Sequence, residues 1–180
     1  MKSKVIIVRG PIGVGKSSIS HLLSDKLKEK VKKLAYIPID VSIYPFMKTF
    51  SKLSNKERRD IMQENVELIL ENFLKRKFTV IVDGGFHRKH NNEFALERLI
   101  RIAKKYKIKT DIIELYAPLG ILHKRISERK KNNPCAWNNP KETEEKYKKF
   151  MKTLHKGAIL IDTENKSVEK IVNQIFRKIK

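Results

Sequence analysis

The chain has 180 residues, with 41 Lys and Arg against 20 Asp and Glu, a formal net charge of +21 and one cysteine. The lone Cys135 excludes an intrachain disulfide and a four-cysteine zinc site. The length predicts one domain, residues 1–180, with a core large enough to be stable without a disulfide or a structural metal. The first predicted strand begins close to Met1 and no apolar run reaches membrane-spanning length, so we expect a cytoplasmic protein with no membrane partner, either a monomer or a homodimer. The charge indicates attraction to polyanions, but scattered lysines also fit an ordinary solvated surface.

The first predicted element is a short strand over residues 5–8, because four consecutive apolar residues are typical of a strand buried on both faces. Residues 10–17, GPIGVGKS, follow it and fit the phosphate-loop pattern G-x-x-x-x-G-K-S/T, with an amphipathic helix behind them. In such a loop backbone N–H groups and the lysine bind phosphates, and the serine hydroxyl binds Mg²⁺. We therefore expect ATP and Mg²⁺ to bind here. The residues expected to contact the nucleotide are Gly10, Gly13, Val14, Gly15, Lys16, Ser17 and Ser18.

Strand and helix patterns alternate along the rest of the chain. The further predicted strands cover residues 34–40, 78–82, 111–116 and 158–161. The helices between and after them are expected to begin near Ser54, Ala95, Pro118, Asn139 and Ser167. This alternation predicts an α/β fold, a doubly wound five-stranded parallel sheet with helices on both faces.

Local signals refine several of these elements. Pro38 favours an edge position for the second strand. Ser54 and Glu57 have the spacing of a capping box, and Asn139 followed by Pro140 is typical of a helix start. Residues 130–140, KKNNPCAWNNP, are rich in Asn and Pro, so we expect them to form a loop that acts as a lid.

Carboxylates follow three of the predicted strands. Ligands of doubly wound sheets bind beyond the C-terminal ends of the strands, where Asp40, Asp83 and Asp162 are expected to lie. Asp83 fits a carboxylate that holds Mg²⁺, and Asp40 fits a general base for an acceptor hydroxyl, although either of the two also fits a turn-capping role. We expect Asp162 to be structural.

Basic residues gather in two places. Arg125 and Arg129 are four residues apart, so they share one face of the helix that precedes the lid, where they either close over a nucleotide or form a solvated face. Residues 87–90, HRKH, form a basic cluster after the third strand. We expect His87 and its neighbours to supply positive charge toward a substrate rather than to bind a metal. Trp137 fits either base stacking or anchoring of the lid.

These motifs together resemble the small P-loop kinases of the adenylate-kinase-like group, most closely the branch with chloramphenicol phosphotransferase, zeta-toxin-like kinases and the 5′-kinase domain of polynucleotide kinases. The resemblance covers essentially the whole chain and rests on VIIVRGPIGVGKSS, PID, TVIVDGGF, LYAPLGILHKRISERK and ILIDTENKSVEKIVNQI. It implies the strand order 2-3-1-4-5, a lid opened by Arg125 and Arg129, and a general base at Asp40. The segment 41–54, with Tyr44, Phe46 and Phe50, matches no family well enough to name an acceptor.

We therefore predict an ATP-dependent kinase in which Lys16, Asp40, Arg125 and Arg129 act in catalysis and Ser17 and Asp83 hold the metal. The chain leaves no room for an RNA-binding module, which favours a small hydroxylated or nucleoside-type acceptor with weak, nonspecific nucleic-acid binding. One alternative is a kinase of RNA or polynucleotide 5′-hydroxyls or of a tRNA-linked hydroxyl, as the net charge favours. The other is a nucleotide-dependent switch with incidental ATPase activity, against which the lid arginines and the candidate base argue.

Overall fold

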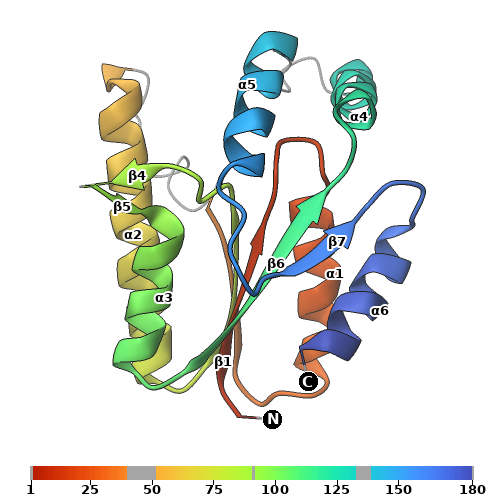
Figure 1. The fold of residues 1–180 in the computed structure, drawn as a ribbon. Helices are drawn as coiled ribbons and strands as arrows, with labels where there is room; N and C mark the ends of the chain where they lie inside the picture. Colours follow the sequence, from red (N-terminus) through yellow and green to blue (C-terminus); the bar gives the residue numbers. More distant parts are fainter. Residues whose placement is uncertain (1, 40–51, 91, 133–138, 180) are drawn as a thin grey trace.

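The computed structural model of the chain describes residues 2–39, 52–90, 92–132 and 139–179. Five parallel strands form the central sheet in the order β2-β3-β1-β6-β7 (Figure 1). Their bounds are Lys4–Arg9 (β1), Leu34–Pro38 (β2), Thr79–Gly84 (β3), Lys109–Tyr116 (β6) and Ile159–Asp162 (β7). The two-residue strands β4 (Lys89–His90) and β5 (Glu93–Phe94) were not predicted, and they form a separate antiparallel pair. When the five strands of the central sheet alone are counted along the chain, their order is the expected 2-3-1-4-5.

The strand β1 lies at the centre of the sheet and pairs in parallel with β3 on one side and β6 on the other. All six of its residues are buried, which agrees with the unbroken apolar run that predicted it. The strand β2 lies at one edge, as Pro38 indicated, since an edge strand leaves one side free of ladder hydrogen bonds.

Helices cover both faces of the sheet. They are Lys16–Lys28 (α1), Asn55–Lys75 (α2), Ala95–Lys105 (α3), Leu119–Asn132 (α4), Pro140–Met151 (α5) and Val168–Lys178 (α6). One apolar cluster joins α1 and α6 to the sheet, and a second joins α2 and α3 to its other face. The helices α4 and α5 stand beyond the C-terminal ends of the strands (Figure 1). None of the helices in the described ranges is both long and apolar enough to cross a membrane.

The predicted helix starts are confirmed. Ser54 and Glu57 form the reciprocal capping box of α2, and the Asn139 side chain accepts a hydrogen bond from the backbone N–H of Glu142 at the start of α5. The predicted lid loop is partly wrong, because α4 continues to Asn132. Lysine is a good helix former, so the first residues of the predicted loop remain helical. Residues 133–138 lie outside the described part of the chain.

Candidate active site

The phosphate-loop segment connects the end of β1 to the first turn of α1. Gly13 and Gly15 have φ values of 82° and 96°, a left-handed conformation that residues with a side chain rarely adopt. Gly15 is the N-cap of α1 and no side chain caps the helix there, so the first N–H groups of α1 face the loop. The Nζ of Lys16 donates hydrogen bonds of 3.0 Å to the carbonyl oxygens of Gly10 and Pro11. The geometry is that of an anion cradle at a helix N-terminus.

A cavity of about 390 Å³ lies against this loop. Its lining comprises Ile12, Gly13, Gly15, Lys16, Ser17, Ser18, Arg125 and Arg129. Six of these eight residues belong to the loop and the start of α1, and the other two are the arginines of α4. The expectation that Arg125 and Arg129 share a face is therefore confirmed. Val14 differs from its neighbours, because its side chain is buried in the core cluster that joins α1 and α6 to the sheet, so it can offer a ligand only its backbone.

Arg125 is held in place by the end of β7. Its Nη1 donates to Thr163 Oγ1 at 3.0 Å and its Nη2 donates to the Thr163 carbonyl oxygen at 2.7 Å. Thr163 is buried, and its hydroxyl donates in turn to the carbonyl oxygen of Tyr116. The neighbouring Asp162 accepts a hydrogen bond from the backbone N–H of Glu164, which fits the structural role expected for it. The sequence pattern had identified Arg125 but not the threonine that orients it.

Asp83 lies at the end of β3, beside β1 in the sheet and opposite Val8 in register. Its side chain is buried, and Oδ2 accepts a hydrogen bond of 2.8 Å from the hydroxyl of Tyr36 on β2. Tyr36 was not predicted to contribute to the site. Asp40, the other candidate carboxylate, lies outside the described residues, as do Tyr44, Phe46, Phe50, Cys135 and Trp137.

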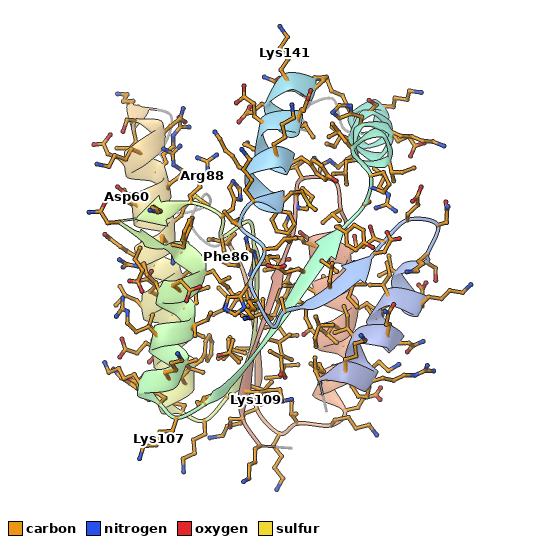
Figure 2. The ribbon with its side chains drawn as sticks, viewed as in Figure 1. Asp60, Phe86, Arg88, Lys107, Lys109 and Lys141 are labelled. Atoms are coloured by element: carbon orange, nitrogen blue, oxygen red, sulfur yellow. The ribbon has the colours of Figure 1, made fainter. Side chains whose placement is uncertain are left out.

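A larger cavity, of about 730 Å³, opens on the other side of the phosphate loop. It is bounded by the loop, by the first turns of α2, by the segment that follows β3 and by α5. Figure 2 shows Arg88 in the space between α2 and α5, with Phe86 deeper, toward the sheet. Lys16 and Ile12 line both cavities, so the two cavities meet at the phosphate loop.

His87 corrects one prediction. Burial, and next the positive charge of Arg88, lower the pKa of His87 to about 4, so the imidazole is neutral at pH 7. The expectation that His87 supplies positive charge is therefore wrong, whereas Arg88 and Lys89 line the larger cavity as cations. Within the described residues no group of three or more His, Cys, Asp or Glu side chains is placed to bind a metal.

A buried ion pair joins β1 to β6, and its arginine also holds the C-terminal end of α5 against the sheet. Arg9, the last residue of β1, pairs with Glu114 of β6 at 2.9 Å, and both side chains are almost fully buried. The Arg9 guanidinium also donates to the carbonyl and hydroxyl oxygens of Thr153 and lies 5.0 Å from the ring centre of Phe150 in α5. Burial raises the pKa of Glu114, and the N–H of His155 and the charge of Arg9 oppose that rise.

Known proteins resemble the chain over nearly its whole length. A shikimate kinase of Persephonella marina is 28% identical over 97% of this chain and 98% of its own. A kinase structure from Chloroflexus aurantiacus, described as putative, covers 100% of both chains at 18% identity with a TM-score of 0.68. A gluconokinase structure from Sinorhizobium meliloti 1021 covers 95% of this chain and 88% of its own at 17% identity, with a TM-score of 0.62. Because these two structures are less than 25% identical to this chain, the likeness shows that they share its fold and nothing more specific.

The fold and the phosphate-loop site define this chain as a P-loop kinase of the adenylate-kinase-like group, an ATP-dependent enzyme. Residues 5–154 match the AAA_33 family, described as an AAA domain, and the chain belongs to that family. The resemblance to the adenylate-kinase-like P-loop kinases is thereby confirmed, and the assignment to one branch of that group stays a prediction.

Proposed function

We propose that this kinase transfers the γ-phosphoryl group of ATP to a hydroxyl group of a small acceptor held in the larger cavity. The observation that carries the proposal is that the two cavities share Lys16. A nucleotide in the smaller cavity and an acceptor in the larger one would present the γ-phosphate and the attacking oxygen to each other beside the Lys16 ammonium group. A volume of about 730 Å³ is in the range of small-molecule sites. The names of the relatives, shikimate kinase and gluconokinase, also favour a small acceptor.

The side chains take distinct roles in this reaction. The bond between the γ-phosphorus and the β–γ bridging oxygen of ATP breaks as a bond to the acceptor oxygen forms, and ADP leaves with the bridging oxygen. Asp40 accepts the proton of the acceptor hydroxyl. Lys16 stabilises the negative charge of the transferring group, and the loop N–H groups hold the phosphates. Arg125 and Arg129 face the nucleotide from α4. Thr163 holds the Arg125 guanidinium in position before the reaction, so Arg125 need not reorganise when charge develops on the transferring group.

Ser17 and Asp83 fit a magnesium site. A hydroxyl at the start of α1 and a buried carboxylate at the end of β3 are oxygen donors of the kind that Mg²⁺ prefers when phosphates supply its other ligands. When bound, the ion neutralises charge on the β and γ phosphates. The Tyr36 hydroxyl orients the Asp83 carboxylate for this role through its 2.8 Å hydrogen bond.

Replacement of Asp83 tests the metal assignment. We expect Asp83→Asn to raise the Mg²⁺ concentration that gives half-maximal activity by about 10- to 100-fold, because the amide keeps the shape but loses the charge. Tyr36→Phe is the matched control, since it removes the hydrogen bond and keeps the carboxylate, and its Mg²⁺ requirement should rise less. An unchanged requirement in Asp83→Asn would show that the carboxylate does not hold the metal.

The acceptor class is tested by a transfer screen with γ-labelled ATP. The panel contains sugars, sugar acids, nucleosides, nucleoside monophosphates and 5′-hydroxyl oligonucleotides, at low and at physiological salt. We expect small acceptors to be labelled at both salt concentrations. Binding of a polynucleotide weakens steeply with salt because counterions are released, so any oligonucleotide labelling should fall. Oligonucleotide labelling that persists at physiological salt, with none of the small molecules, would contradict the proposal.

A further inference from the structure

We infer that this protein has a second binding surface, for the phosphate backbone of a double-helical nucleic acid, at the end of the sheet opposite the phosphate loop. This surface, the basal face, consists of Lys2 and residues 29–33, 75–77 and 104–109, which lie at or next to the N-terminal ends of four strands. The inference goes beyond the proposed transfer reaction and does not depend on it, because none of these described residues lines either cavity.

Four neighbouring strands bring the basic segments into one row. Three of the segments lead into β2, β3 and β6, and Lys2 leads into β1. Since these strands follow one another in the order β2-β3-β1-β6, the four segments lie side by side, about 4.8 Å apart from strand to strand (Figure 1). Figure 2 shows Lys107 and Lys109 near one end of the molecule and Arg88, beside the larger cavity, near the other.

Hydrogen bonds hold adjacent segments of the basal face together. The Nζ of Lys33 donates to the carbonyl oxygen of Arg76 at 3.2 Å, which joins the segments before β2 and β3. The hydroxyl of Ser3 donates to the carbonyl oxygen of Lys77 at 2.7 Å, which joins the start of the chain to the same segment. Lys109 pairs in register with the first residue of β1. The basal face is therefore one continuous surface.

The basal face is almost uniformly cationic. Its eleven exposed cations are Lys2, Lys30, Lys32, Lys33, Lys75, Arg76, Lys77, Lys104, Lys105, Lys107 and Lys109, and Glu29 is its one carboxylate. Two further carboxylates border the face and are already paired, Glu71 with Lys105 at 2.7 Å and the buried Asp111 with Lys4 at 2.9 Å and Lys109 at 3.2 Å. Close to half of the net charge of +21 is thus concentrated on one face, unlike the scattered lysines of an ordinary solvated surface.

Two lysines of the basal face occupy backbone positions that glycine usually takes. Lys77 and Lys107 follow α2 and α3 with φ values of 60° and 56°. In both turns the N–H of the lysine and the N–H of the next residue donate to carbonyl oxygens of the last helical turn, the Schellman arrangement in which glycine is preferred. A cation in the last turn stabilises a helix, but these two lie beyond the helix end in a strained conformation. Fold stability therefore does not account for them, whereas anion binding does.

The chemistry of the basal face favours duplex phosphates over lipids or single-stranded bases. None of the large apolar side chains that are exposed in the described part of the chain belongs to the face, so it offers no apolar group for insertion into a membrane. Its two aromatic rings, Phe78 at the border and Tyr106, are half-buried, and the ammonium groups of Lys33 and Lys105 lie 5.7 and 5.6 Å from their centres. Rings covered in this way give bases little surface for stacking, and a duplex has a high density of phosphate charge.

Binding of a labelled RNA duplex of mixed sequence tests the inference. The Kd is measured by fluorescence anisotropy over a series of salt concentrations, with and without ADP and Mg²⁺ to occupy the phosphate loop. We expect a Kd of about 1–100 μM at physiological salt, unchanged by the nucleotide, because phosphate contacts alone give nonspecific affinities of this order.

Four substitutions locate the binding surface. We expect Lys32→Gln/Lys75→Gln/Lys77→Gln/Lys107→Gln to bind the duplex about 100-fold more weakly, with the slope of log K against log salt reduced by about 2–4, because each lost phosphate contact removes nearly one unit of slope. The matched control removes the same charge from exposed lysines outside the basal face, in Lys141→Gln/Lys149→Gln/Lys152→Gln/Lys170→Gln. This control should bind within about threefold of the wild type, since salt screens distant charges.

A glycine variant separates binding from stability. Glycine adopts the left-handed conformation without strain, so Lys77→Gly/Lys107→Gly should keep the wild-type melting temperature or raise it by up to about 4 °C. The same variant should bind the duplex about 10-fold more weakly, because it loses two cations. A lower melting temperature together with unchanged duplex binding would show that the two lysines serve the helix ends, and would contradict the inference.

Three other results overturn the inference. Equal loss of duplex binding in the two quadruple variants shows that the charge of the whole protein, and no particular face, attracts the duplex. Displacement of the duplex by ADP and Mg²⁺ shows that it binds at the phosphate loop. Binding to vesicles of phosphatidylserine and phosphatidylcholine, with none to the duplex at physiological salt, shows that the basal face meets a membrane surface instead.

Discussion

Lys16→Ala is expected to lower kcat/KM for phosphoryl transfer about 10³-fold, which corresponds to ~4 kcal/mol of transition-state stabilisation. The ammonium group lies where the two cavities meet, held at 3.0 Å by the carbonyl oxygens of Gly10 and Pro11. Charge accumulates on the transferring phosphoryl group only during the reaction, so a cation already positioned there acts mainly on the rate. The measurement is steady-state transfer of labelled phosphate from ATP.

Lys28→Ala is the matched control for Lys16→Ala. Lys28 lies in the last turn of the same helix, exposed and paired with Asp25 at 3.0 Å, far along α1 from the loop. Its replacement should leave kcat/KM within about twofold, because an exposed ion pair contributes little. Wild-type turnover in Lys16→Ala, in a protein that unfolds at the wild-type temperature, would contradict the assignment of Lys16.

Arg9→Met is expected to destabilise the fold by about 3–5 kcal/mol. The replacement leaves Glu114 as a buried carboxylate without its cation, and it removes two hydrogen bonds to Thr153. For a chain of this size such a loss lowers the melting temperature by roughly 10 °C or more. Calorimetric or circular-dichroism melting measures the effect.

Two further variants separate the ion pair from its surroundings. The double variant Arg9→Met/Glu114→Gln should recover part of the lost stability, because it removes the uncompensated charge. Arg101→Met breaks the exposed Arg101–Glu93 pair, whose separation of 3.0 Å is close to the 2.9 Å of the buried pair. This replacement should lower the free energy of unfolding by less than about 1 kcal/mol. If Arg9→Met melts like Arg101→Met, the buried pair does not anchor α5.

Much of the fold could be predicted because its signals are local. The strands β1 and β3 are buried along their whole length, and each contains an unbroken apolar run, residues 5–8 and 80–82, that is visible in the sequence without any partner. The starts of α2 and α5 depend on Ser54 and Asn139, each of which caps a backbone N–H three residues later. The phosphate loop is equally local, since consecutive residues form the whole cradle.

The features that escaped prediction join segments far apart in the sequence. Tyr36 contacts Asp83 from another strand, Thr163 holds Arg125 from another element, and Arg9 finds Glu114 only after β1 and β6 have paired. The neutral state of His87 has the same origin, because neighbouring basic residues are visible in the sequence while the burial that lowers its pKa is not. The strands β4 and β5 have two residues each, too few to show a period.

The central position of β1 also sets the order in which the sheet can assemble while the chain is being synthesised. Val5 pairs with Val80 of β3 on one side and with Thr110 of β6 on the other. A nascent chain that has left the ribosome as far as β3 can therefore satisfy one edge of β1, and the second edge stays open until β6 emerges. An open edge of apolar, β-branched residues is a template for pairing with other chains. We therefore expect pairing of the open edge of β1 with other chains to occur mainly during one stage of translation, after β3 has emerged and while the helix α3 is being synthesised.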